Sequence, residues 1–72
     1  MKELFDKLAR EKGDVTRRIN KLDTFINTNS TFRTLTFREK CLMKKQLRHM
    51  LKYHKCIAGR MDIIKMRMKE AK

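Results

Sequence analysis

Proline is absent from this 72-residue sequence, and glycine occurs only twice, as Gly13 and Gly59. Tight turns depend on these two residue types, so a sheet with many turns is excluded and long helices are favoured. A chain of this length gains only about 3–5 kcal/mol from one hydrophobic core, so it usually needs a staple, a metal or oligomerisation. We therefore expect an all-α fold, with residues 1–72 forming a single helical hairpin domain.

A row of apolar residues at helical spacing runs through the first part of the chain. Its members are separated by seven, four, three and four positions; they are Leu8, Val15, Ile19, Leu22 and Ile26. Such spacing is typical of a seam that packs against a second helix.

Gly13 determines whether this part forms one helix or two. A glycine inside a helix costs about 1 kcal/mol relative to alanine. Asp14 can also cap a new helix, because its carboxylate accepts hydrogen bonds from free amides. The sequence predicts a short N-terminal helix over residues 2–12 and a longer one over 14–26. A continuous helix with one weak position is an equal alternative.

A polar connection over residues 27–35 leads to the second long helix. The run NTNST is expected to end the preceding helix near Asn27. Thr36 and Glu39 have the spacing of a capping box, so the next helix should begin there and continue to residue 70. The apolar residues of the connection should pack against the hairpin end; they are Phe32 and Leu35. Two antiparallel helices leave their outer flanks uncovered, so we expect a homo-oligomer.

The charge restricts the partners. The chain has 20 Lys and Arg against 8 Asp and Glu, a net charge of +12, which favours polyanions. On the second helix four basic residues follow one another in steps of four; they are Lys40, Lys44, Arg48 and Lys52. This ridge fits a solvated face and a nucleic-acid-binding surface equally well. A transmembrane segment is not expected, because no run of about 18 apolar residues exists, and we expect no membrane partner.

No motif for catalysis or metal binding is present. We find no nucleophile beside a base, no carboxylate pair and no glycine-rich phosphate loop, so we expect a protein that is not an enzyme and has no cofactor. His49 and His54 are five positions apart, which is not the spacing of a helical metal site. Cys41 and Cys56 are expected to be buried or half-buried thiols in a reducing cytosol.

Three features could contact a ligand. Lys21, close to Arg18, offers a compact charge for a phosphate, although an ordinary surface lysine is the more frequent explanation. Phe5 is the aromatic residue on which a purine could stack. Gly59, next to Arg60, would allow the close approach of a neighbouring helix or of a ligand, and tight helix packing is favoured.

The stretch EKGDVTRRINKLDTFI at residues 11–26 and the stretch IAGRM at 57–61 resemble a known pattern. They resemble the hairpin domain shared by the phage anti-CBASS cyclic-nucleotide sponge and a Thoeris anti-defence sponge. The residues that match are Glu11, Lys12, Val15, Arg18, Ile19, Lys21, Leu22, Phe25 and Ile26, followed by Gln46, Leu47, Met50, Tyr53 and Arg60. The resemblance extends over about residues 4–61.

The resemblance implies a function. Members of that family are small helical proteins that form homohexamers in the host cell cytoplasm. They bind cyclic oligonucleotide second messengers without cleaving them, and so block host immune effectors. Cyclic dinucleotides would lie between subunits, with Phe5 on a base and Lys21 at the phosphates. Cyclic trinucleotides would bind near the threefold axis through Asp23 or Thr24 and through Arg60. The implied ligand-binding residues are Phe5, Arg18, Lys21, Asp23, Thr24 and Arg60.

Two other classes of function stay open. A small basic accessory protein would bind nucleic acid through the ridge, with an affinity that falls steeply with salt. A structural helix pair that docks on an acidic protein would depend on the seam at Val15 or Leu47, but not on Lys21.

Overall fold

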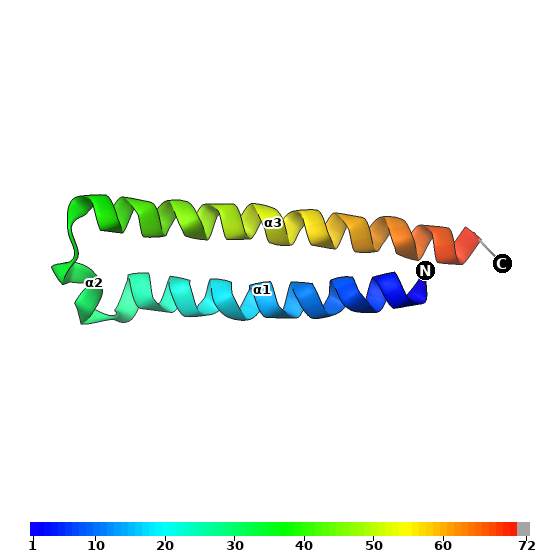
Figure 1. Cartoon of the computed structure of the whole chain (residues 1–72), viewed down its shortest axis with the longest axis horizontal. Coiled ribbons are helices and arrows are strands. Elements are labelled where there is room, and N and C mark those ends of the chain that lie inside the picture. Colours follow the sequence, from blue (N-terminus) through cyan, green and yellow to red (C-terminus); the bar gives the residue numbers. More distant parts are fainter. Residues whose placement is uncertain (71–72) are drawn as a thin grey trace.

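The computed structural model describes residues 1–70 as an elongated antiparallel pair of long helices (Figure 1). Helix α1 spans Lys2–Thr28, the short helix α2 spans Ser30–Thr34, and helix α3 spans Phe37–Glu70. The rod measures 56 × 15 × 14 Å along its principal axes. The predicted all-α hairpin is therefore confirmed for the described part of the chain.

Helix α1 continues through Gly13 without a break, so the predicted short N-terminal helix over residues 2–12 is wrong and the alternative of one continuous helix is confirmed. Gly13 does not have a positive φ, and an added Cβ would meet only Arg17 Nη1, at 3.9 Å. Asp14 does not cap a new helix; its carboxylate forms an exposed ion pair with Arg17 in the next turn. Packing of α1 along α3 outweighs the cost of about 1 kcal/mol for one glycine.

The connection contains a five-residue helix that the sequence did not predict. Helix α1 ends at Thr28, one residue beyond the predicted Asn27. Asn29 then starts α2, because its side-chain oxygen accepts a hydrogen bond from the Thr31 amide at 2.8 Å. Asparagine is among the strongest N-cap residues, so this polar segment forms one extra helical turn instead of an open loop.

Helix α3 begins at the predicted cap. The Glu39 amide donates a hydrogen bond to Thr36 Oγ1 at 3.1 Å. Phe32 lies against the hairpin end as predicted, edge-to-face with Phe25 at 6.2 Å between ring centroids. Phe37, the first residue of α3, is 83% exposed and lies outside this cluster.

In the described part of the chain, one cluster of buried hydrophobic residues joins the two long helices. Its buried residues are Leu8 and Val15 from α1 and Ile57 and Ile64 from α3. Within each helix the two residues are seven positions apart, the repeat of a coiled-coil seam. The partly buried residues packed against them are Phe5, Ile19 and Met61.

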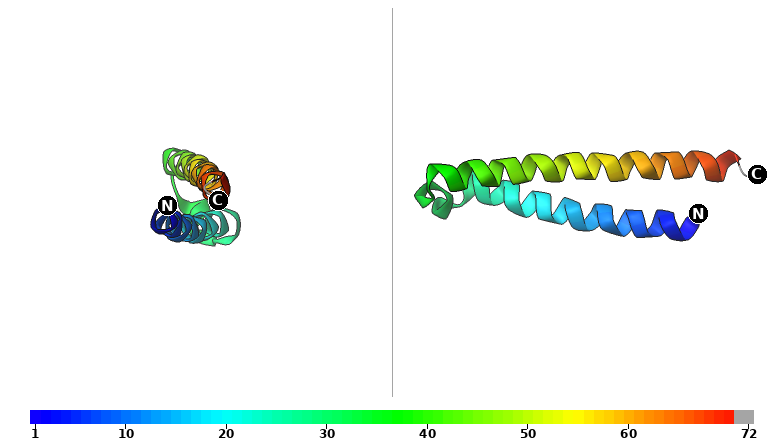
Figure 2. Two further views of the ribbon diagram at one scale, coloured as in Figure 1. Left: turned by 90° about the vertical axis from the view of Figure 1, so that its right-hand side faces the viewer. Right: turned by 45° about the horizontal axis from the view of Figure 1, so that its top comes forward.

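The seam is better buried at the open end of the hairpin than near the turn. Toward the turn its positions are only half-buried; they are Leu22, Ile26, Met43, Leu47 and Met50. The end-on view in Figure 2 shows two helices side by side with neither flank covered. Large apolar side chains therefore stay exposed, among them Leu42, Leu51, Tyr53, Ile63 and Met66.

Candidate ligand-binding site

One flank of the seam carries a row of residues from each long helix. The row on α1 contains Glu11, Arg18 and Phe25, and the row on α3 contains Gln46, Tyr53 and Arg60. Residues seven positions apart lie on nearly the same face of a helix, so each row follows one edge of the seam. We call these two rows, together with Lys21, the binding flank.

A hydrogen bond between Tyr53 and Glu11 joins the two rows. The Tyr53 phenol donates it to the Glu11 carboxylate, with 3.1 Å between the oxygens. This hydrogen bond raises the pKa of Tyr53, and the negative charge of Glu11 adds to the effect, because both favour the protonated phenol. The positive charges of Arg60 and Arg18 act in the opposite direction on the same pKa. Both arginines therefore act electrostatically on the phenol.

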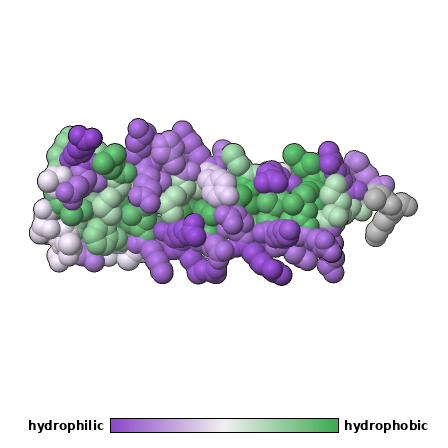
Figure 3. Space-filling view, viewed as in Figure 1, coloured by the Kyte–Doolittle hydropathy of each residue, from purple (hydrophilic) through white to green (hydrophobic). Residues whose placement is uncertain are grey.

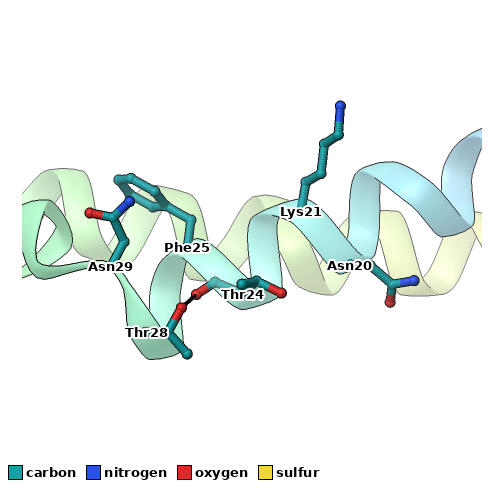
Figure 4. Close-up of a pocket in the computed structure, with 6 residues that line it drawn as sticks. All are labelled: Asn20, Lys21, Thr24, Phe25, Thr28 and Asn29. Atoms are coloured by element: carbon teal, nitrogen blue, oxygen red, sulfur yellow. Dashed lines mark hydrogen bonds between the residues drawn. The ribbon is translucent and has the colours of Figure 1, made fainter.

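Two of the shallow, open hollows on this flank lie around Lys21, toward the turn. The hollow between the helices is lined by Arg18, Lys21, Leu22, Phe25, Gln46 and Met50. The second lies on α1 and is lined by Asn20, Lys21, Thr24, Phe25, Thr28 and Asn29 (Figure 4). Because Lys21 and Phe25 line both hollows, the two form one continuous surface.

This surface combines a cation with an aromatic ring and small polar groups. In Figure 4 the Lys21 side chain extends away from α1, and the Phe25 ring lies toward Asn29. The Thr28 hydroxyl donates a hydrogen bond to the Thr24 carbonyl at 2.6 Å. An ammonium group binds a phosphate as a point charge, and an aromatic ring offers apolar area to a base. The hollows therefore combine a positive charge with apolar area and small polar groups.

Two predicted site residues lie apart from these hollows. The Asp23 side chain lines neither hollow, and its carboxylate accepts a hydrogen bond from the Asn27 amide at 3.0 Å. Phe5 is 16 residues from Lys21, about 24 Å along α1. Its ring packs on the buried cluster, and Lys65 Nζ lies 5.7 Å from the ring centroid. Phe5 and Lys21 of one chain are thus too far apart to hold the same base and phosphate.

The structure therefore brings together only some of the predicted site residues. Arg18, Lys21 and Thr24 lie close together, and Arg60 lies farther along the same flank. Site residues that the sequence reasoning missed are Phe25, Gln46, Met50 and Tyr53. Phe25, Gln46 and Tyr53 could have been found by the spacing of seven in each row, and all four residues belong to the family pattern at 11–26 and 46–60.

Three expectations about α3 need correction. Lys40 is not part of the exposed basic ridge, because it is half-buried with its Nζ 5.7 Å from the Phe32 ring centroid. Cys41 and Cys56 are exposed and not buried or half-buried, because they face away from the seam. An added Cβ at Gly59 would meet nothing within 4 Å, so no helix of the same chain packs closely there.

The fold and the flank define the class of protein: a two-helix hairpin that offers an open, basic and partly apolar surface to a partner. Within residues 1–70 no three His, Cys, Asp or Glu side chains are grouped so as to hold a metal ion. None of the helices in this range has the length and apolarity needed to cross a membrane.

The chain belongs to the Sequestin family, which it matches over residues 2–63. This match confirms the resemblance found at residues 11–26 and 57–61. The family's name indicates that its members sequester a ligand, which is the role of a binding protein. No curated protein and no solved structure matches the chain.

Proposed function

We propose that this protein sequesters cyclic oligonucleotide second messengers without cleaving them, and so withholds them from host immune effectors. The observation that carries the proposal is the position of Arg18 and Lys21 at the edge of a hollow that also contains Leu22, Phe25 and Met50. The sequestering role of the Sequestin family supports it. In this proposal the protein is a phage product that acts in the cytoplasm of the host cell.

The chemistry of the flank fits such ligands. A cyclic oligonucleotide carries one phosphate per nucleotide and presents its bases at the edge of a closed ring. Charge-assisted hydrogen bonds from Arg18 or Lys21 to a phosphate are stronger than neutral ones. A base can rest on the apolar surface of Phe25 and Met50. Rigid helices keep these groups in position, which lowers the entropic cost of binding.

The proposed assembly is a homo-oligomer, and the family resemblance implies that it is a hexamer. The accessible surface is 6138 Å², whereas a compact monomer of 8.8 kDa has about 4,800 Å². The excess comes from flanks that a second hairpin can cover. An antiparallel neighbour would also bring its Phe5 toward Lys21 of the first chain. The two residues could then contact one ligand, although within one chain they are about 24 Å apart.

Titration calorimetry tests this function. The purified chain is titrated with a cyclic dinucleotide and with a cyclic trinucleotide at about 0.15 M salt, the physiological ionic strength. We expect tight binding of at least one of them, with fewer than one ligand per chain and intact ligand recovered after heat denaturation. Folded, oligomeric protein that binds neither ligand would overturn the proposal.

Matched variants locate the site. Lys21→Ala should weaken binding at least tenfold, because it removes a phosphate contact. Lys44→Ala removes an exposed lysine from the outer side of α3 and should leave the affinity unchanged. Equal losses in both variants would mean that only the net charge matters.

A second set of variants separates the two ligand classes. Phe5→Leu keeps apolar packing on the buried cluster but removes the ring, and should weaken cyclic dinucleotide binding alone. Arg60→Ala and Thr24→Ala should weaken cyclic trinucleotide binding alone. Asp23→Ala is expected to have little effect, because Asn27 already occupies that carboxylate.

A further inference from the structure

The outer side of α3 carries a second basic surface, separate from the binding flank. We call it the outer ridge; its residues are Lys44, Lys45, Arg48, Lys52 and Lys55, all of them exposed. Successive helical residues are about 100° apart, so Lys44, Arg48, Lys52 and Lys55 point away from the seam. Lys45 lies at the edge of the ridge nearest the binding flank, where it lines a hollow with Gln46 and Tyr53. Figure 3 shows hydrophilic side chains along the edge formed by α3, separated from those along α1 by an apolar band.

Within residues 1–70 no carboxylate forms an ion pair with the outer ridge. Residues 40–61 contain seven Lys and Arg and no Asp or Glu. The ion pair found within residues 1–70 joins Arg17 to Asp14, both on α1. Like charges at four-residue spacing destabilise a helix, as Lys44, Arg48 and Lys52 do here. The fold thus carries a repulsion that an external polyanion would relieve.

The shape of the outer ridge indicates which polyanion it fits. Each step of four residues advances about 6 Å along α3 and turns about 40° around it, so Lys44, Arg48 and Lys52 form a row inclined to the helix axis. Lys45 and Lys55 widen and extend this row to about 17 Å. A long row on a rigid rod matches an extended phosphate backbone, whereas a compact cyclic ligand reaches only one or two of its cations.

The side chains of the outer ridge also limit the kind of recognition. None of them is aromatic, so they provide no platform on which the bases of a single strand could stack. None is Asn or Gln, the residues that read adenine in the major groove. Lysine-rich contacts to phosphates bind a duplex without regard to its sequence.

We propose that the outer ridge binds the phosphate backbone of double-stranded nucleic acid, without sequence preference and independently of the binding flank. Each cation that contacts a phosphate releases bound counterions from the duplex. About four such contacts per chain predict that the logarithm of affinity falls with the logarithm of salt with a slope near −3.6. Affinity should therefore drop about 100-fold between about 50 and 200 mM salt.

The test measures the fluorescence anisotropy of a labelled DNA duplex titrated with the full chain at several salt concentrations. The triple variant Lys44→Gln, Arg48→Gln, Lys52→Gln should bind at least tenfold more weakly, with a slope reduced to about −1. Its charge-matched control changes exposed residues of α1 by the same amount: Lys2→Gln, Lys7→Gln, Arg10→Gln. The control should keep most of the affinity and the full slope.

Three further measurements complete the test. Lys44→Arg with Lys52→Arg retains the charge and should retain duplex binding. Circular dichroism should show unchanged helicity in the glutamine variant, since the repulsion along α3 is removed. Its affinity for cyclic nucleotides should also be unchanged, so a failure of the ridge proposal and a failure of the sequestering function are separable.

Specific outcomes would overturn the ridge proposal. An equal loss of duplex affinity in both triple variants would mean that total charge, and not the ridge, is responsible. A salt slope near zero would exclude phosphate contacts. Binding of the chain to anionic lipid vesicles but not to the duplex would assign the ridge to a membrane surface instead.

Discussion

Replacing each helical glycine by alanine tests how the two long helices are built. Gly13 lies within α1, where an added Cβ would meet only the flexible end of Arg17, at 3.9 Å. Gly59 lies within α3, where nothing is within 4 Å of an added Cβ. Neither glycine has a positive φ. Each substitution should therefore raise the free energy of unfolding by about 1 kcal/mol, the difference in helix propensity.

Thermal unfolding followed by circular dichroism measures this effect. For a chain of this size, about 1 kcal/mol raises the midpoint temperature by about 4–8 °C. Variants are compared at equal protein concentration, because the midpoint of an oligomer depends on it. A lower midpoint temperature for Gly13→Ala would refute the continuous helix α1 and would favour a helix break at residue 13. A lower midpoint or altered assembly mass for Gly59→Ala would mean that another subunit occupies the open space.

Three further predictions concern the seam, the α3 cap and the interhelical hydrogen bond. Ile57→Ala, at a side chain only 2% exposed, should cost about 2–5 kcal/mol in chemical denaturation, whereas Ile63→Ala, 55% exposed, should change stability little. Thr36→Ala removes the acceptor for the Glu39 amide and should cost about 1 kcal/mol by the same measurement. Glu11→Gln should lower the pKa of Tyr53 toward its ordinary value, which absorbance titration of this single tyrosine detects. Folding raises the pKa of Tyr53, so the protonated phenol stabilises the folded chain. This contribution to stability is complete at neutral pH and is lost as the pH rises past about 10. Glu11→Gln should make the stability depend less on pH in this range.

The main features of the fold follow from spacing and capping. The repeat that contains Leu8 and Val15 predicted the seam, and Thr36 marked the start of α3. The sequence left the continuity of α1 through Gly13 as one of two equal alternatives, because packing against α3, and not local propensity, decides it. Helix α2 was also missed, since its five residues carry no apolar periodicity.

The candidate site was less predictable than the fold. The family pattern indicated Lys21, Arg18 and Arg60, but the Tyr53–Glu11 hydrogen bond joins residues 42 positions apart. It depends on the register between the helices, and a shift of one heptad would preserve the same apolar pattern. Lys40 shows a similar ambiguity: its spacing fits both the basic ridge and the seam, and contact with Phe32 decides between them.

The burial of Leu8, Val15, Ile57 and Ile64 at the open end of the hairpin has a kinetic consequence. These residues join segments that are at least 42 positions apart in the chain, so the best-buried contacts close the longest loop. Closing such a loop costs about 1 kcal/mol more than closing one of about 10 residues at the turn. Lengthening the turn changes this cost little, because each doubling of the loop adds only about 0.6 kcal/mol. The hairpin should therefore tolerate an insertion near Asn29, yet unfold readily when the last turns of α3 are removed.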